Sequence, residues 1–388
     1  MKRFLFVLIT ALMLSSCSSE NVNSYVDIEK TNEKINIQKA DENDENISID
    51  DKAKIFMQNC SIASNHIIIC EQDNKKSINI NTGEISSLCD IPGCAHDINN
   101  SKGCLEFQTL NNPICSNQGF YYTNYSEPGK LHYKTGNEDK VVYENSFFTE
   151  KDKEIDPDAK NAFSMFVRDN KMYIVGQVYF YTVDLKTFKQ TCEPVVITDS
   201  PIWNADVYDE YFYITNENLE LIRYDMKNRK KEKMSDKVWR IQANRKGLYY
   251  IKSDGEQQSL FFTKNGEKNE TKLISDVGLN MYVTESSIYY TSKDGIYKSD
   301  PEGKNAVKIE LSLTYDNGEK YYMQDSRNIQ MITCPSSDHI YLLDYKHSTG
   351  EKCYNALFSI DKKTNECKAI SLGIWYQPVG GNEEILSY

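Results

Sequence analysis

The sequence lacks the motifs by which the common enzyme classes are identified. It contains no Gly-x-Ser-x-Gly, His-Glu-x-x-His, P-loop or Gly-x-Gly-x-x-Gly segment, which argues against serine hydrolases, zinc peptidases and the usual nucleotide-binding enzymes. Carboxylate pairs such as Asp206 and Asp209 do not indicate acid–base catalysis, because the chain has 57 acidic residues. The sequence therefore predicts no enzyme activity and no organic cofactor.

Long basic runs are also missing. The nearest one, Arg229-Lys230-Lys231-Glu232-Lys233, is interrupted by a glutamate and is typical of a solvated turn between strands. The formal net charge is −12, and a protein this acidic is repelled by nucleic acid. We therefore expect no nucleic-acid partner.

Long hydrophobic runs are confined to the first residues of the chain. Two basic residues precede Phe4–Leu14, an apolar stretch of about 11 residues that is too short to span a bilayer and is typical of a secretion signal. Leu14-Ser15-Ser16-Cys17 then resembles the lipobox of bacterial lipoproteins. The resemblance implies that residues 1–17 are a lipoprotein signal, and that Cys17 carries diacylglycerol and palmitate chains that anchor the protein to the extracytoplasmic face of the cell membrane. The alternative is an ordinary signal peptide.

Residues 18–54 contain neither glycine nor proline, and Tyr25 is their one aromatic residue. Asp, Glu, Asn and Lys dominate this segment, so it cannot bury enough apolar surface to offset its chain entropy. We predict a disordered acidic tether that holds the folded part, residues 55–388, away from the membrane.

The folded part is organised around seven short apolar triplets, each of which follows a turn. Their central residues are 53, 52, 40, 36, 40 and 52 positions apart. A second strand of the type Leu/Ile-x-Tyr and a third, amphipathic strand follow most of them. The triplets are Ile67-Ile68-Ile69, Phe120-Tyr121-Tyr122, Met172-Tyr173-Ile174, Phe212-Tyr213-Ile214, Leu248-Tyr249-Tyr250, Ile288-Tyr289-Tyr290 and Ile340-Tyr341-Leu342.

A strand repeat of this length indicates an all-β fold, a β-propeller of about seven four-stranded blades, within a range of about six to eight. An irregular sandwich or two separate β domains are the alternatives. The longer gaps predict loops at residues 86–117, 144–168 and 311–335, and loops on a rigid ring are where binding surfaces usually lie.

Two strands of this repeat resemble those of a known family. Tyr289-Tyr290-Thr291-Ser292 and Tyr121-Tyr122-Thr123-Asn124 resemble the Tyr-Trp-Thr-Asp strands of low-density-lipoprotein-receptor-type propellers, and are more similar still to related propeller domains of unknown function in bacterial lipoproteins. Tyr stands in place of Trp, Ser or Asn in place of Asp, and the chain has seven units where the receptor type has six. The resemblance spans residues 55–388 and implies the fold, but no ligand.

A cysteine- and histidine-containing loop is the strongest candidate for chemistry. Cys89, Cys94, His96 and Cys104 have the spacing C-x4-C-x-H-x7-C, and Cys115 follows. Thiolates and an imidazole could bind zinc, but the paired C-x2-C of zinc ribbons is missing. Outside the cytoplasm such thiols form disulfides. We expect a disulfide, with zinc or free thiols as the alternatives.

Two other cysteine positions permit a geometric prediction. Cys353 and Cys367 flank one hairpin, but its turn at residues 362–365 places Cys367 opposite about Ile360, so the two cysteines are not cross-strand partners. Cys192 lies in a strand and is predicted to be a small buried apolar residue.

Together these features predict a membrane-anchored extracytoplasmic lipoprotein. Its monomeric, non-catalytic propeller would bind an unidentified protein, peptide or glycan. One alternative is a metal-binding or thiol-redox protein that uses the loop with Cys89, Cys94, His96 and Cys104. The other is a glycan- or solute-binding partner of a surface complex.

Overall fold

The computed structural model describes residues 60–63, 66–71, 74–87, 110–115, 120–124, 127, 129–135, 138–144, 164–168, 170–311, 329–333, 338–348 and 353–376. All of them belong to one compact unit, Ile35–Tyr388. Within these ranges the regular structure consists of β-strands. No helix there is long and apolar enough to cross a membrane.

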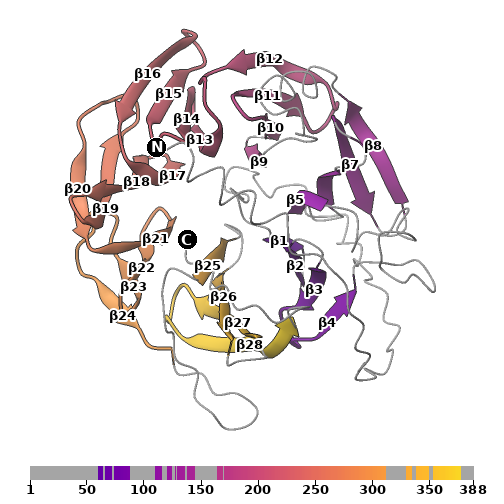
Figure 1. The fold of residues 1–388 in the computed structure, drawn as a ribbon, viewed down its shortest axis with the longest axis vertical. Helices are drawn as coiled ribbons and strands as arrows, with labels where there is room; N and C mark the ends of the chain where they lie inside the picture. The colour runs from indigo at the N-terminus through magenta and orange to yellow at the C-terminus, as the bar shows by residue number, and fades with distance from the viewer. Residues whose placement is uncertain are drawn as a thin grey trace, which may run out of the picture. The chain divides into compact units, whose positions relative to one another are not determined.

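The described strands form seven antiparallel sheets of four strands each, and every sheet consists of four strands that are consecutive in the chain. First strands of neighbouring sheets contact one another in most cases, and β1 of the first sheet contacts β25 of the last. The third and fourth sheets are joined by a shared hydrophobic cluster. The sheets therefore follow one another around a ring with their first strands innermost (Figure 1). This arrangement is a seven-bladed β-propeller, as predicted, and the sheets are called blades 1 to 7 in chain order.

Each blade contributes one strand to each of four positions. The innermost strands are β1 (Cys60–Ala63), β5 (Leu110–Cys115), β9 (Ser164–Arg168), β13 (Ile202–Tyr208), β17 (Val238–Asn244), β21 (Val277–Val283) and β25 (Ile329–Thr333). The second strands are β2 (His66–Glu71), β6 (Phe120–Asn124), β10 (Lys171–Val175), β14 (Tyr211–Asn216), β18 (Gly247–Asp254), β22 (Ile288–Ser292) and β26 (His339–Ser348). The third strands are β3 (Asn74–Asn79), β7 (Lys130–Thr135), β11 (Tyr179–Asp184), β15 (Leu221–Asp225), β19 (Gln257–Lys264), β23 (Gly295–Ser299) and β27 (Cys353–Asp361). The outer strands are β4 (Ile85–Ser87), β8 (Glu138–Glu144), β12 (Gln190–Val196), β16 (Lys230–Ser235), β20 (Thr271–Ser275), β24 (Val307–Ile309) and β28 (Cys367–Tyr376).

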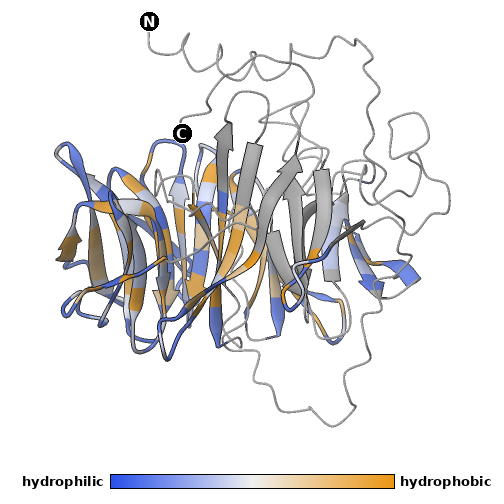
Figure 2. Ribbon diagram, turned by 90° about the horizontal axis from the view of Figure 1, so that it is seen from below, coloured by the Kyte–Doolittle hydropathy of each residue, from blue (hydrophilic) through white to orange (hydrophobic). Residues whose placement is uncertain are grey.

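All seven predicted triplets lie on the second strands of their blades. These strands are buried on both faces where their side chains are described, whereas outer strands such as β16 and β20 are largely exposed. Hydrophobic residues accordingly lie along the strands and hydrophilic residues gather at the turns (Figure 2). The continuous apolar triplets are therefore the signature of a strand that packs against two neighbouring blades.

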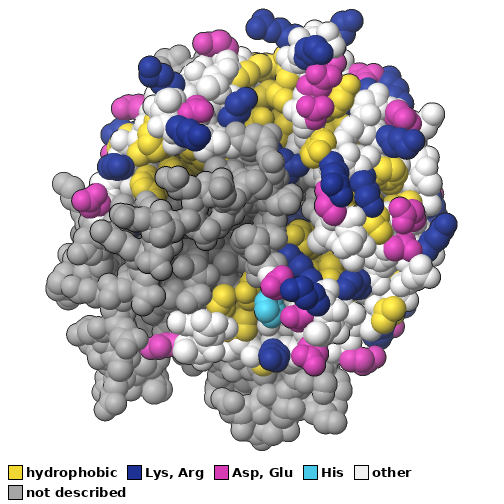
Figure 3. All heavy atoms as spheres, turned by 180° about the vertical axis from the view of Figure 1, so that it is seen from behind, with side chains coloured by type: hydrophobic (Ala, Val, Ile, Leu, Met, Phe, Trp, Pro, Cys, Tyr) yellow, Lys and Arg dark blue, Asp and Glu magenta, His cyan; other side chains and the backbone are white. Residues whose placement is uncertain are grey.

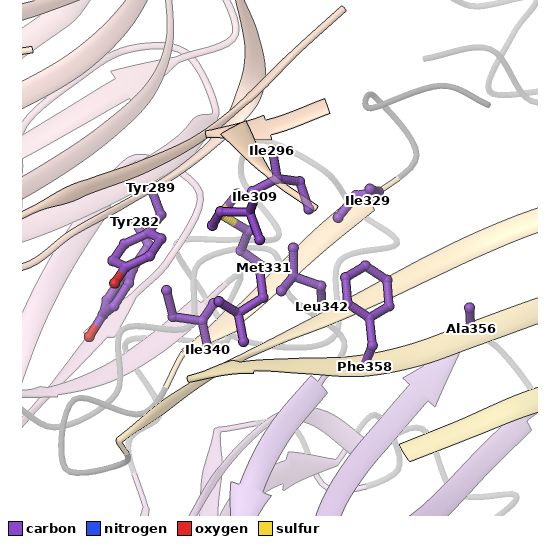
Figure 4. Close-up of a cluster of buried hydrophobic side chains, with 11 residues drawn as sticks. Tyr282, Tyr289, Ile296, Ile309, Ile329, Met331, Ile340, Leu342, Ala356 and Phe358 are labelled. Atoms are coloured by element: carbon purple, nitrogen blue, oxygen red, sulfur yellow. The ribbon is translucent and has the colours of Figure 1, made fainter. Parts of the chain in front are cut away.

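The hydrophobic core lies between blades. One cluster joins Tyr282, Tyr289 and Ile296 of blade 6 to Ile340 and Phe358 of blade 7 (Figure 4). Separate clusters occupy the interfaces between blades 2 and 3, 3 and 4, 4 and 5, and 5 and 6. Since each blade is only one sheet thick, it buries its apolar faces by stacking on its neighbours.

The central tyrosines of three triplets form hydrogen bonds to the next blade through their hydroxyl groups. The hydroxyl of Tyr213 donates to Asn265 Oδ1 at 3.2 Å, that of Tyr249 to the Pro301 carbonyl at 3.4 Å, and that of Tyr289 to the Lys362 carbonyl at 3.2 Å. Each acceptor lies in the turn between the third and fourth strands of the next blade. A buried tyrosine ring thus fills the interface, while its hydroxyl fixes the register of two blades.

The turns between third and fourth strands repeat another device. Asp184, Asp225 and Asp361 end their third strands and accept hydrogen bonds from backbone N–H groups two or three residues later. These hydrogen bonds lower the pKa of all three carboxyl groups. An aspartate that closes such a turn is a local signal for the end of the strand.

The sequence pattern did not predict the innermost strands. Three of the expected loops are therefore shorter than predicted. Leu110–Cys115, Ser164–Arg168 and Ile329–Thr333 are strands β5, β9 and β25, although they fall within the segments 86–117, 144–168 and 311–335. The expected loop 86–117 also overlaps the end of β4. Polar residues interrupt the innermost strands, so they lack the strong apolar pattern of the triplets.

Candidate functional site

Most residues selected from the sequence lie outside the described ranges. This applies to Cys17, Cys89, Cys94, His96 and Cys104. Cys115 is at the end of β5, where its backbone pairs with Phe120. The described ranges hold no group of three His, Cys, Asp or Glu side chains suited to a metal ion.

The two cysteines that are described in full are free thiols, Cys192 and Cys367. Cys367 lies opposite Ile360 and Cys353 opposite Tyr376, which confirms that they are not cross-strand partners. Cys192 is half-buried against the apolar cluster between blades 3 and 4, close to the buried apolar role expected of it. Burial raises the pKa of the Cys367 thiol to about 12, so neither position offers a reactive thiolate.

The innermost strands connect neighbouring blades through polar side chains. Asp206 on β13 is 1% exposed and accepts a hydrogen bond from the Ala243 backbone N–H on β17. Gln242 on β17 donates to the Val283 carbonyl at 2.9 Å and accepts from the Val283 N–H at 2.8 Å. These side chains satisfy the backbone edge of the next innermost strand, where no further strand pairs with it. Asp206 therefore has a structural role as an acceptor between blades 4 and 5, whereas Asp209 is exposed.

Two tryptophans lie at matching irregularities of the innermost strands. The pairing register shifts between Ile202 and Asn204 on β13, and between Val238 and Arg240 on β17. The extra residues at these β-bulges are Trp203 and Trp239, whose ring centroids are 6.3 Å apart. Both indoles are half-buried. Bulges commonly redirect a side chain at a functional position, and here two adjacent blades present an aromatic pair.

Arg240 follows Trp239 directly and is half-buried on β17. Burial lowers the pKa of its guanidinium, and no hydrogen bond or ion pair to it is found in the part of the chain that the structure describes. The described Arg223 and Arg245, in contrast, are ion-paired with Glu232 and Glu285. Among the described residues, therefore, none neutralises the charge of Arg240.

A second polar group lies within blade 2. His132, 6% exposed, stacks on the Tyr122 ring, and its Nδ1 lies 3.4 Å from Asp139 Oδ1. Its Nε2 lies 3.2 Å from Glu127 Oε2, without hydrogen-bond geometry. Burial and the hydrogen bond to Asp139 raise the pKa of Tyr122. Among the described residues no nucleophile or third metal ligand joins this group, so we assign it to the internal order of blade 2.

Trp203 and Trp239 form an aromatic pair across blades 4 and 5, and Arg240 follows Trp239 on the same strand. We call these three residues the inner-edge site; indole rings can stack on a flat group, and a guanidinium can pair with an anion. The sequence patterns did not identify these three residues as candidates for a binding site. The sequence does indicate that the two tryptophans occupy equivalent positions in neighbouring blades. Two of the chain's 3 tryptophans are 36 residues apart, the same spacing as the triplet centres Tyr213 and Tyr249.

No sequence profile of a known protein family matches the chain, and no characterised protein is similar to it in sequence. Several solved structures resemble it. A computationally designed protein, Ika8, has 8% identity over 83% of this chain and 89% of its own, with a TM-score of 0.48. BamB from Moraxella catarrhalis has 12% identity over 74% and 82%, with a TM-score of 0.42. A chain of a nidogen/laminin complex has 10% identity over 80% and 93%, with a TM-score of 0.37. These similarities concern the fold alone.

Proposed function

We propose that this protein is an extracytoplasmic lipoprotein, anchored to the cell membrane through Cys17, whose monomeric propeller binds a ligand and catalyses no reaction. The observation that carries the binding role is the inner-edge site, where half-buried indoles of two neighbouring blades form a pair and the adjacent Arg240 has no hydrogen bond or ion pair among the described residues. Tryptophan and arginine are among the residue types most enriched at binding sites. The resemblance of Tyr289–Ser292 to lipoprotein propellers supports the same reading.

The distribution of charged side chains supports a binding protein whose partner is not a nucleic acid. Figure 3 shows acidic and basic side chains interspersed over one face of the described residues, without a field of a single sign. The basic run Arg229–Lys233 was predicted to be a solvated turn, but residues 230–233 belong to the outer strand β16. Arg229 and Lys230 are exposed, and Glu232 pairs with Arg223 and Lys268. A protein, peptide or glycan therefore remains the class of partner that we propose.

Replacing Cys17 with Ser tests the anchor. A hydroxyl cannot accept the thioether-linked lipid, so the variant should leave the membrane fraction or stay unprocessed with its signal attached. Cell fractionation with mass determination of the product measures this. Cys192→Ser is the matched control, since it removes a thiol from the folded part, and it should fractionate like the wild type. A normally trimmed Cys17→Ser protein that stays in the membrane fraction would exclude the lipoprotein proposal.

The cysteine loop gives a second test, between structural and metal-binding roles. We propose that a disulfide closes the loop around Cys89 and Cys104, which stabilises by constraining the unfolded chain. His96→Ala should then leave the melting temperature unchanged, reductant should lower it, and chelator should have no effect. Thermal melting and metal analysis of both proteins check this. One equivalent of zinc in the wild type that is absent from the His96→Ala variant would establish the metal-binding alternative instead.

A further inference from the structure

The repeat supplies an internal control for the role of Arg240. In the pairing ladders Asp206 lies opposite Tyr213 and Gln242 lies opposite Tyr249. Asn204 and Arg240, each two residues earlier, therefore occupy the same place in blades 4 and 5.

At this place in blade 4 the fold uses a neutral amide. The Asn204 side chain donates to Thr215 Oγ1 at 3.0 Å and to the Trp239 carbonyl of blade 5 at 2.9 Å. Blade 5 has a guanidinium there, which makes neither of the equivalent bonds. The position thus does not require a positive charge for folding, and a half-buried unpaired charge opposes folding. A residue that the fold would better replace by an amide is a candidate for function.

Trp203 and Trp239 define what lies beside this charge. Trp239 is held in place, since its indole N–H donates to Ser253 Oγ at 3.0 Å. Its carbonyl is fixed by Asn204. The two rings, tilted by 39° to one another, present flat apolar surface directly adjacent in sequence to Arg240. The chain as a whole is acidic, with a net charge of −12, so a cation without an acidic partner among the described residues is a local attraction for an anion.

We propose that the inner-edge site binds a small organic acid, in which a carboxylate is attached to a flat apolar body. This inference rests on the proposed binding function and assigns to this one site a small solute, separate from the protein, peptide or glycan proposed as the partner of the propeller. The guanidinium fork matches a carboxylate with two parallel hydrogen bonds, and the indoles stack on the flat body. An inorganic anion would use the arginine and leave both rings uncovered, so it fits the site less well.

The experiment uses phenylacetate as the probe, with acetate and benzyl alcohol as its two halves. Titrations of the full-length protein follow tryptophan fluorescence and melting temperature at constant ionic strength. Phenylacetate should quench fluorescence and raise the melting temperature more than either half does. Arg240→Gln should weaken phenylacetate binding about tenfold, the loss expected for one bidentate charged pair, and should leave the weak benzyl alcohol response unchanged. Trp203→Leu should weaken binding of both ring-bearing probes.

The matched control is Arg245→Gln, an arginine five residues along the same strand connection whose charge is already paired with Glu285. It should bind phenylacetate like the wild type. The ligand-free Arg240→Gln protein should melt at the same or a higher temperature, because an unpaired charge is removed. Equal effects of acetate and phenylacetate on the wild type, equal losses in both arginine variants, or a markedly lower melting temperature of Arg240→Gln would each overturn the inference. Absence of binding to every probe would also overturn it, and would leave the lipoprotein proposal to be decided by Cys17→Ser.

Discussion

Replacing Asp206 with Ala should lower the free energy of unfolding by about 3 kcal/mol, the cost of leaving buried backbone donors without a charged acceptor. The Asp206 carboxylate accepts from the Val207 N–H at 2.7 Å and from the Ala243 N–H of the next blade. Ala243 is 3% exposed, so water cannot replace the lost acceptor. Urea denaturation of both proteins gives the difference.

Two further variants separate the effect of the hydrogen bonds from that of charge. Asp206→Asn keeps the size and one acceptor oxygen, so its stability should lie between those of the wild type and Asp206→Ala. Asp209→Asn changes the neighbouring exposed carboxylate, which sits in the turn with φ 54°, and should shift stability by less than about 0.5 kcal/mol. If Asp206→Ala unfolds at the same urea concentration as Asp209→Asn, the bridge between blades 4 and 5 does not stabilise the ring.

Gly247→Ala should destabilise the protein by about 2 to 3 kcal/mol, the range for forcing extra volume into a packed interior. Gly247 begins β18, buried opposite Lys264 of β19. A Cβ built there would lie 2.2 Å from the Thr263 carbonyl oxygen and 2.7 Å from a carbon of the Phe262 ring. The carbonyl belongs to a paired strand, so relief requires that β18 and β19 separate locally. Thermal and urea unfolding measure the loss.

Gly255→Ala is the matched control, in the turn at the other end of β18. Its backbone has φ +69°, but a Cβ there meets nothing within 4 Å. Only the backbone preference is lost, which costs about 1 kcal/mol. Equal stabilities of the two variants would mean that the close approach at Gly247 relaxes at little cost.

The seven triplets show how much of the fold was predictable. A strand between two blades must be apolar on both faces, and a run such as Leu248-Tyr249-Tyr250 carries that requirement locally. The innermost strands are different, because Asp206 and Gln242 are stabilised by the backbone of the next blade, about 40 residues away. A hydrophobic pattern over a short stretch of sequence therefore does not predict these strands, because it carries no information about a partner in the next blade.

The candidate site was predictable to a smaller extent. The equal spacing of Trp203 and Trp239 with the triplets marks them as related positions, but their proximity depends on two β-bulges. That no described residue pairs with Arg240 is a property of the three-dimensional arrangement, since glutamates and aspartates are plentiful in the sequence. Whether Arg240 has an acidic partner can therefore be decided only from the three-dimensional structure.

The ring closes without any exchange of strands: each blade is four consecutive strands, and β1 meets β25 at the junction of the first and last blades. A genetic duplication or deletion of one whole unit would therefore leave every sheet complete. The tyrosine hydroxyls of blades 4, 5 and 6 all reach forward to the following blade, so an inserted unit would bring its own bond to its successor. A lineage built on this plan can change the number of blades one unit at a time. The inner-edge site spans β13 of blade 4 and β17 of blade 5, so the loss of either unit would remove part of it.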